Sequence, residues 1–327
     1  MKILMVGGTR FVGRHIVEAA LHHGHDVTLV HRTATELFPE AEHLLLDRDG
    51  DLSVLDERDF DATIDASAYF PRQVRALATA LGGRGGHYVL ISSVSAYDIP
   101  AGPGYDESSP LLPPAADDVD SITNETYGPL KVSCELAAAE LFGDATTIVR
   151  PTYVIGPWDY TRRFTSWVER IAEGGEVLGP GSPGDPAQVI DGRDMGAWIV
   201  RLVENGVSGA FHAASPPPPY SFADLLGDIV VAVGPPGTTV TWVDQQWLFD
   251  QGEDEASFPL WAAGDPSMDV GAADPRVAAL AGLQPRPVRQ SVLEILEDLG
   301  EHPLAGERPG LSREREAELL AAWHARG

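Results

Sequence analysis

The sequence predicts an α/β protein in which a parallel sheet is followed by a smaller α/β lobe. Three observations support this fold class. Short apolar runs alternate with amphipathic stretches up to residue 150, a glycine-rich turn separates the first apolar run from the first helical pattern, and the alternation ends after Pro151. Because crossover helices cover both faces of such a sheet, the alternation indicates that its strands are parallel.

Hydrophobic periodicity places the predicted elements in chain order. Strands are expected at residues 2–6, 26–30, 44–46, 62–64, 87–91 and 146–149, with late strands at 189–190 and 209–213 that return to the same sheet. Helices are expected at residues 12–21, 72–81, 128–142 and 312–325, the last with Ser312 as its N-cap.

The change of rhythm after Pro151 sets the expected domain boundary. Prolines and glycines cluster at residues 179–186 and 216–219, and aromatic residues gather between 242 and 261. We therefore expect one domain at residues 1–155, to which 189–214 returns, and a smaller lobe at 156–188 and 215–327.

The charge balance excludes several classes of protein. The chain has 327 residues, with 23 lysine and arginine against 49 aspartate and glutamate residues, which gives a formal charge of −26. Such a chain repels phosphate backbones, and its longest basic run is Arg162-Arg163, so we expect no nucleic-acid and no membrane partner. Apolar runs are too short to span a bilayer, the N-terminus does not resemble a signal peptide, and Cys134 is the only cysteine. We expect a cytoplasmic protein.

The strongest local signal lies between the first strand and the first helix. This segment consists of Gly7, Gly8, Thr9, Arg10, Phe11, Val12 and Gly13. Glycines there allow a sharp turn and a close approach to a pyrophosphate, whose charge is met by N–H groups at the helix N-terminus. The segment predicts a dinucleotide site on a doubly wound Rossmann sheet; the alternative is a glycine-rich turn without a ligand. Arg10 replaces the usual middle glycine and places a cation beside the phosphates.

The end of the second strand bears on the choice of cofactor. Chains that bind NAD place there a carboxylate, which hydrogen-bonds the ribose diol. This chain has Arg32 instead, and Asp26 lies at the other end of the strand. Because a guanidinium matches phosphate geometry, Arg32, joined by Arg10, favours NADP over NAD. The alternative is that Arg32 stacks on adenine or faces solvent.

Tyr127 and Lys131 are one helical turn apart and lie on one face of the expected helix. An ammonium beside a phenol lowers the phenol pKa from about 10 toward the working pH, which suits an acid/base tyrosine. Ser92, Ser93 and Ser95 follow the fifth strand, at the edge where open parallel sheets bind ligands. A hydroxyl there could hydrogen-bond a substrate carbonyl. The alternatives are an exposed surface pair and ordinary turn serines.

In this order, the glycine loop, the serines and the Tyr-x-x-x-Lys pair resemble the extended short-chain dehydrogenase/reductase family, also called NAD-dependent epimerase/dehydratases. The resemblance covers nearly the whole chain. It implies that Ser93 orients a substrate carbonyl and that Tyr127 is the acid/base. It also implies that Lys131 tunes Tyr127 and holds the nicotinamide ribose.

The resemblance implies further contacts as well. The cofactor contacts are Asp47 and Arg48 after the third strand, Ala66, Ser67 and Ala68 after the fourth, and Pro151 after the sixth. Apart from the resemblance, substrate contacts are expected from Ser95, from Tyr153, for which core packing is the alternative, and, as binders of a carboxylate or diphosphate, from Arg162, Arg163 and Arg193. No metal site is expected, because the three neighbouring histidines His22, His23 and His25 are interpreted as a solvated loop at a helix end.

Two departures narrow the expected function. Val94 and Ser95 stand where dehydrating members of the family place an Asp-Glu pair, so dehydration is disfavoured. The form Gly-Gly-Thr-Arg-Phe-Val-Gly also resembles a divergent branch that includes chloroplast stem-loop RNA-binding proteins, and the net charge argues against that role.

We therefore predict an NAD(P)-dependent oxidoreductase or epimerase. It would act at a secondary alcohol or ketone of a sugar, nucleotide-sugar or similar small molecule, and we hypothesise a homodimer. The alternatives are an NADPH-dependent ketone reductase of secondary metabolism and a non-catalytic relative that senses a cofactor or binds RNA.

Overall fold

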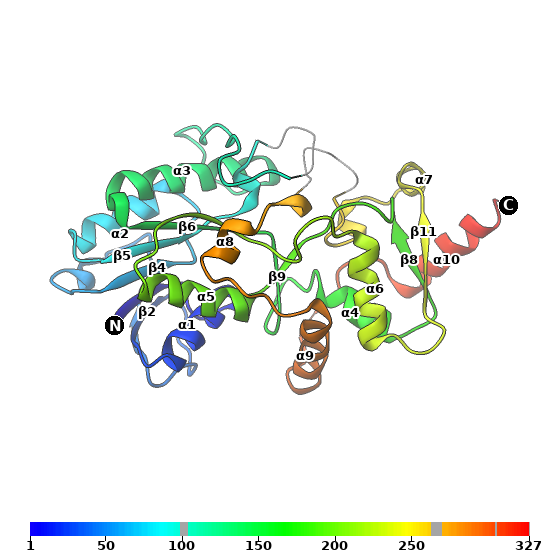
Figure 1. Cartoon of the computed structure of the whole chain (residues 1–327), viewed down its shortest axis with the longest axis horizontal. Coiled ribbons are helices and arrows are strands. Elements are labelled where there is room, and N and C mark those ends of the chain that lie inside the picture. The colour runs from blue at the N-terminus through cyan, green and yellow to red at the C-terminus, as the bar shows by residue number, and fades with distance from the viewer. Residues whose placement is uncertain (99–103, 263–269, 305, 327) are drawn as a thin grey trace.

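A seven-stranded parallel sheet forms the centre of the larger domain (Figure 1). The computed structural model describes residues 1–98, 104–262, 270–304 and 306–326. In spatial order the strands are β10 (Gly209–Ala213), β6 (Thr146–Pro151), β5 (His87–Ile91), β4 (Ala62–Asp65), β1 (Lys2–Val6), β2 (Asp26–His31) and β3 (Glu42–Leu45). This is the predicted doubly wound order. It reverses between β1 and β4, where the carboxyl ends of the strands open a crevice for a ligand.

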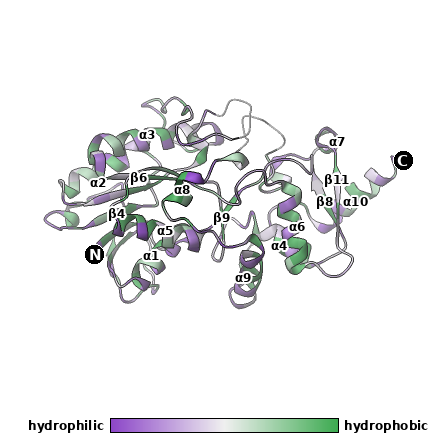
Figure 2. Cartoon of the chain, viewed as in Figure 1, coloured by the Kyte–Doolittle hydropathy of each residue, from purple (hydrophilic) through white to green (hydrophobic). Residues whose placement is uncertain are grey.

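Helices cover both faces of the sheet. The helices that pack in pairs are α1 (Phe11–His22) with α5 (Gly192–Glu204) on one face, and α2 (Pro71–Leu81) with α3 (Asn124–Phe142) on the other. Alternate strand residues face opposite layers, so Met5 belongs to the core under α1 and α5, whereas Leu4 belongs to the core under α2 and α3. Hydrophobic residues accordingly concentrate along the strands (Figure 2). Burying one such side chain contributes about 1.5–3 kcal/mol.

The second lobe lies beside the sheet domain along the long axis of the molecule (Figure 1). Its two parallel strand pairs are β8 (Glu176–Pro180) with β11 (Thr239–Val243) and β7 (Tyr153–Ile155) with β9 (Val189–Asp191). Its helices are α4 (Thr165–Ala172), α6 (Phe222–Val233), α7 (Gln245–Asp250), α9 (Val288–Glu301) and α10 (Arg313–His324). The predicted C-terminal helix is therefore present, and the side chain of Ser312 caps it. Trp167, Phe222, Phe258 and Trp261 lie in the core of this lobe.

Short 3₁₀ turns complete the described secondary structure. They are η1 (Ser53–Leu55), η2 (Val94–Ala96), η3 (Gly143–Ala145), η4 (Glu255–Ser257) and η6 (Val270–Ala272). None of the described helices is both long and apolar enough to cross a lipid bilayer.

Two segments differ from the sequence expectation. β9 pairs with β7 and does not join the large sheet, whereas β10 does. The short helix α8 (Arg276–Leu280) falls in the range expected for the second lobe, yet it packs against β10. Ala278 is buried in the core of the sheet domain, and the indole of Trp198 donates to the Ala281 carbonyl at 3.0 Å. Such tertiary pairings leave no signal in local periodicity.

Candidate active site

A cavity of about 350 Å³ lies at the carboxyl edge of the large sheet, where the sheet domain meets the second lobe. Its walls come from the start of α1, the segments that follow β4, β5 and β6, and one face of α3. The predicted site residues that line it are Phe11, Val12, Ala66, Ser93, Ser95, Tyr127, Lys131, Pro151, Tyr153 and Arg163. The cavity thus joins the glycine loop, the serines and the tyrosine–lysine pair in one place.

The glycine loop leaves no room for a side chain at Gly7, Gly8 or Gly13. Gly7 has a φ of +89°, and a Cβ on Gly13 would lie 1.9 Å from the carbonyl oxygen of Gly7. A Cβ on Gly8 would lie 2.7 Å from the side chain of Val17. α1 therefore starts directly against the end of β1. Its N-cap residue, Arg10, makes no capping hydrogen bond through its side chain within the described chain. Free N–H groups at such a helix start suit a pyrophosphate.

The side chains of Tyr127 and Ser93 both line the cavity, and the Ser93 hydroxyl lies near enough to the phenol to affect its pKa. The Ser93 hydroxyl oxygen also accepts the backbone N–H of Ser95 at 3.1 Å, which orients it at the strand end. Burial raises the pKa of Tyr127 above its ordinary value of 10.0, although the Ser93 hydroxyl and the charge of Arg163 act in the opposite direction. The net shift of this pKa is therefore upward and not, as the sequence predicts, toward neutral pH, because burial outweighs the neighbouring positive charge of Arg163.

Lys131 is buried between the ends of two strands. Its ammonium donates to the carbonyl oxygens of Ala68 and Ile91, each at 2.9 Å, and lies 4.9 Å from the centre of the Tyr69 ring. The same nitrogen is 5.8 Å from the centre of the Tyr127 ring. Burial lowers the pKa of Lys131, although the nearby acidic groups, among them Asp65 and Glu135, act in the opposite direction. The two carbonyls use two of the three ammonium hydrogens, which leaves one to reach a ligand in the cavity.

The residue at which α3 begins determines where Tyr127 and Lys131 lie. The helix begins at Asn124, earlier than expected, because the Thr123 hydroxyl caps it by accepting the N–H of Thr126 at 3.3 Å. Pro129 consequently lies in the second turn of the helix and not in the first. Gly128 allows the close approach of α3 to η2, because a Cβ there would lie 2.2 Å from the Ser95 carbonyl oxygen.

Arg48, one of the cofactor contacts that the resemblance implies, is buried in an ion pair. The residue is 8% exposed, and its guanidinium donates to both carboxylate oxygens of Asp65, at 2.6 and 2.8 Å, and to the Ser67 hydroxyl at 2.9 Å. Tyr88 also donates to Asp65, at 3.1 Å. This buried pair holds the segment after β4 beneath the glycine loop. The Asp47 carboxylate, by contrast, accepts a local turn contact from the backbone N–H of Asp49 at 3.0 Å.

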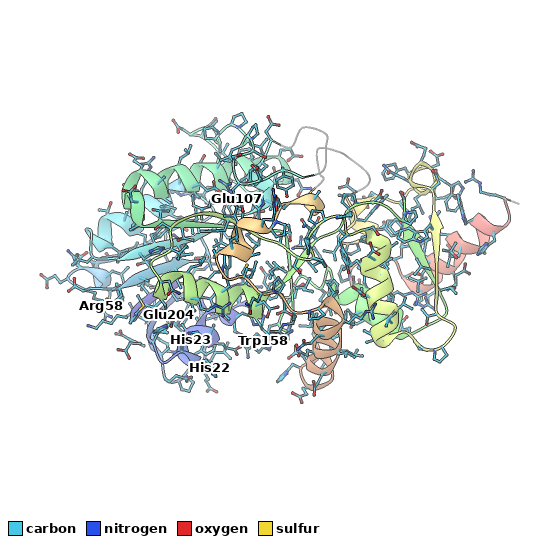
Figure 3. The ribbon with its side chains drawn as sticks, viewed as in Figure 1. His22, His23, Arg58, Glu107, Trp158 and Glu204 are labelled. Atoms are coloured by element: carbon cyan, nitrogen blue, oxygen red, sulfur yellow. The ribbon has the colours of Figure 1, made fainter. Side chains whose placement is uncertain are left out.

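The loop after β7 folds onto the start of α1. The Arg10 guanidinium carbon lies 3.9 Å from the centre of the Tyr160 ring, at the edge of the cavity. The Arg14 guanidinium carbon lies 3.3 Å from the centre of the ring of Trp158, where the two lobes meet (Figure 3). Arg32 follows β2 directly and is exposed. Arg10 is therefore held at the start of α1, whereas Arg32 is exposed at the end of β2.

The three arginines predicted to bind substrate have different surroundings. Arg163 lines the cavity, with its guanidinium carbon 5.0 Å from the centre of the Tyr153 ring. Arg162 lies outside the cavity lining and donates to both carboxylate oxygens of Glu169 at 2.8 Å.

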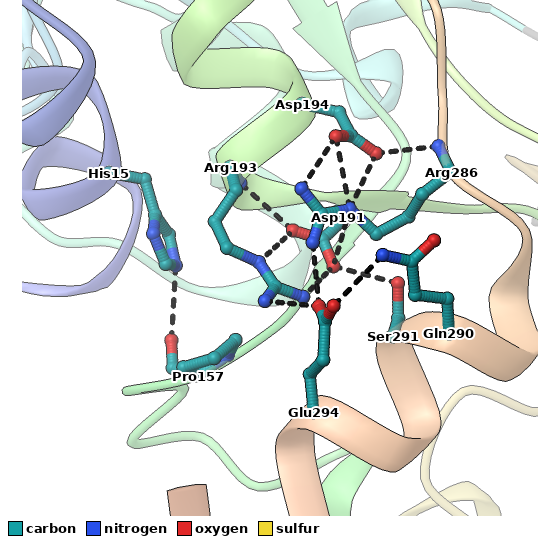
Figure 4. Close-up of polar contacts among 9 residues, drawn as sticks. All are labelled: His15, Pro157, Asp191, Arg193, Asp194, Arg286, Gln290, Ser291 and Glu294. Atoms are coloured by element: carbon teal, nitrogen blue, oxygen red, sulfur yellow. Dashed lines mark hydrogen bonds and ion pairs between the residues drawn. The ribbon is translucent and has the colours of Figure 1, made fainter. Parts of the chain in front are cut away.

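Arg193 also lies outside the cavity lining. It belongs to an ion-pair cluster that ties α5 to α9 (Figure 4). It donates to Asp191 at 2.9 and 2.6 Å and pairs with Glu294. Arg286 completes the cluster by pairing with Asp194 and Glu294. Of the three arginines, only Arg163 is placed to meet an anionic substrate group.

Sequence reasoning missed two features of the site. Tyr69, which directly follows the predicted segment of Ala66 to Ala68, lines the cavity. An aromatic residue just after a strand was the sequence signal that could have indicated it. Glu135, one turn beyond Lys131, accepts from the Ser92 hydroxyl at 2.5 Å and pairs with Arg150 at 2.6 Å. A charged residue in the apolar part of the helix pattern was the signal for this buried anchor.

The chain belongs to the NAD dependent epimerase/dehydratase family, which matches residues 3–213. This match confirms the family that the sequence motifs predict. The match includes the glycine loop, the serines and the tyrosine–lysine pair, so these features lie within the region that defines the family.

The similar proteins include two structures solved with a dinucleotide and one stem-loop binding protein. The human epimerase family protein SDR39U1 (isoform 2), solved with NADPH, has a TM-score of 0.64 at 20% identity, covering 91% of this chain and 99% of that chain. WbmH from Bordetella bronchiseptica, solved with NAD⁺, has a TM-score of 0.65 at 16% identity, covering 93% and 99%. The chloroplast stem-loop binding protein of 41 kDa b from Arabidopsis thaliana is 26% identical over 222 residues. That match spans 62% of this chain and 55% of the relative, so the chain spans about half the length of that protein.

Because Gly13 lies so close to Gly7, one methyl group added at Gly13 should disturb the glycine loop. We expect Gly13→Ala to weaken NADPH binding at least about tenfold and to lower the unfolding temperature, because relieving such an overlap costs about 1–3 kcal/mol or more. Fluorescence titration with NADPH and thermal unfolding measure the two effects. Gly227→Ala in α6 is the control, since nothing lies within 4 Å of the added Cβ. Equal NADPH binding by the two variants would show that the loop does not hold the dinucleotide.

Proposed function

We propose that the protein is an NAD(P)-dependent oxidoreductase or epimerase that transfers hydride at a secondary alcohol or ketone carbon. The observation that carries this proposal is the placement of Ser93, Tyr127 and Lys131 on one cavity that begins at the glycine loop. A substrate of the sugar or nucleotide-sugar class, or a similar small molecule, fits a cavity with several hydroxyl groups and Arg163 at its wall.

The bound nicotinamide supplies or accepts the hydride. Around it, the Ser93 hydroxyl holds the substrate oxygen while the Tyr127 phenol gives it a proton, or removes one in the reverse direction. Lys131 presents its remaining N–H to the cofactor ribose and supplies the positive charge of the site. Val94 and Ser95 stand where dehydrating members carry an Asp-Glu pair, and neither side chain ionises near neutral pH as a carboxyl group does, which is the reason to disfavour dehydration.

Reduction of a ketone with NADPH is the second candidate, and it is favoured by a specific observation. Burial keeps Tyr127 protonated at neutral pH, as a proton donor must be. The end of β2 offers Arg32 and no carboxylate, which suits the extra phosphate of NADP. The proposal therefore names NADP as the favoured cofactor and NAD as the alternative.

The proposal extends to the cellular setting of the protein. It takes a small-molecule substrate and no nucleic acid, in keeping with the charge of −26. We propose a cytoplasmic location and a homodimer formed through α3. On that helix, Leu136 is 54% exposed and Leu141 is 41% exposed.

Removal of one phenol oxygen tests the role of Tyr127. The wild-type protein is first incubated with NADPH or NADH and a panel of ketones and nucleotide sugars, and a substrate that turns over is kept for the variants. We expect Tyr127→Phe to bind NADPH normally and to lower turnover at least about a hundredfold, the usual size of general acid/base catalysis. The matched control is Tyr220→Phe, whose hydroxyl contacts Asp228 in the second lobe. Near-normal turnover by Tyr127→Phe would refute the role.

The raised pKa of Tyr127 predicts opposite pH dependences for the two directions of reaction. Alcohol oxidation needs the ionised phenol as a base, so its rate should rise with pH and reach no plateau below pH 10.0, since burial holds the pKa above that value. Ketone reduction uses the protonated phenol and should be nearly independent of pH around neutrality. Initial rates in both directions across neutral and alkaline pH provide the comparison. A plateau of the oxidation rate near neutral pH would contradict the assignment.

A further inference from the structure

Two histidines and a glutamate meet at the edge of the sheet domain remote from the cavity. His23 Nδ1 and His25 Nε2 each lie 3.0 Å from the same oxygen, Oε1 of Glu204. Figure 3 shows His23 and Glu204 next to each other, at the side of the domain formed by α1 and α5. The two histidines flank the tight turn between α1 and β2, and Glu204 is the last residue of α5. The side chain of His23 is 28% exposed, that of His25 8% and that of Glu204 30%, so the group is accessible but not fully solvated.

The backbone fixes the three side chains before any ligand binds. The N–H of His23 donates to the Ala19 carbonyl at 3.0 Å and the N–H of His25 to the Ala20 carbonyl at 3.1 Å, while Gly24 takes a φ of +78° between them. α1 and α5 pack tightly through the shared core. The distance between the turn and the end of α5 is therefore set by helix packing and not by the polar contacts themselves.

We infer that this group is a binding site for a divalent transition-metal ion such as Zn²⁺. Imidazole nitrogen and carboxylate oxygen are the ligands that such ions take. The three ligand atoms lie within 4.8 Å of one another. Metal bonds of 2.0–2.1 Å in a tetrahedral site separate ligand atoms by about 3.3 Å, so small side-chain movements suffice. Three protein ligands leave a fourth position for water.

The sequence-based interpretation of a solvated histidine loop did not include Glu204, which is distant in the chain. Glu204 turns the histidine loop into a candidate metal site, because one oxygen of its carboxylate faces an imidazole nitrogen of both His23 and His25. A metal ion would replace the ring hydrogens that these nitrogens share with Glu204.

The site would act as a clamp and not as a catalyst. It joins the amino-terminal end of β2 to the end of α5, whereas the cavity lies at the carboxyl ends of the strands. An ion that binds the folded chain and not the unfolded chain stabilises the fold by mass action. The inference is independent of the proposed enzyme activity.

Titration of the chelator-treated full-length protein with ZnCl₂ tests the inference. We expect one saturable site by calorimetry and a rise in the unfolding temperature of about 4 °C at a free concentration a hundredfold above Kd. Glu204→Gln and His23→Gln, each at a side chain that is about one-third exposed or less, should weaken binding more than about tenfold. The matched control is His22→Gln, which removes the adjacent imidazole that lies outside the group and should leave binding unchanged.

Two further readouts keep the result interpretable. CoCl₂ in place of ZnCl₂ should give the intense visible absorption of a four-coordinate ion, and this absorption should be lost in Glu204→Gln. The unfolding temperature without metal and the affinity for NADPH should be the same in all variants, which shows that each has folded. Absence of saturable zinc binding, or zinc affinity equal in Glu204→Gln, His23→Gln and His22→Gln, would overturn the inference.

Discussion

The contact between Gly13 and the carbonyl of Gly7 is the constraint on which the arrangement of the site depends. Because neither residue carries a Cβ, α1 can start directly against the end of β1, with its first N–H groups facing the crevice. The position of α1 in turn sets that of α5, which packs on it, and that of the loop whose Tyr160 and Trp158 cover Arg10 and Arg14. A displaced α1 would move both the phosphate site and one wall of the cavity.

The opposite wall depends on buried polar contacts of α3. Lys131 joins the ends of two strands by donating to Ala68 and Ile91, and Glu135 joins Ser92 to Arg150. Burying these charges costs free energy that their mutual pairing largely offsets, so their value lies in fixing the helix and not in net stability. They hold the helix at a defined rotation and height, and so hold the Tyr127 phenol beside the Ser93 hydroxyl. Acid/base catalysis needs this positional accuracy.

Local patterns predicted most of the sheet domain, because strand and helix periodicities and the glycine turn are properties of neighbouring residues. The site residues that line one cavity are mainly those recognised from a short sequence motif, above all Tyr127 and Lys131. The surroundings of Arg48 and Arg193 could not be predicted, since their partners Asp65 and Glu294 are found only through the fold. The same limit applies to the pKa of Tyr127, since spacing reveals a nearby ammonium but not the burial that outweighs it. Glu204 likewise meets His23 only because α1 and α5 pack together.

The crystal structure of the NADPH complex tests the central claim most directly, through the position of the nicotinamide C4 atom relative to the Tyr127 hydroxyl. The account predicts a diphosphate at the glycine loop. It also predicts C4 at the cavity, so that a substrate carbon about 3–3.5 Å from it can have its oxygen hydrogen-bonded to Tyr127 and Ser93. A nicotinamide bound elsewhere, or a Tyr127 side chain turned away from it, would contradict the account.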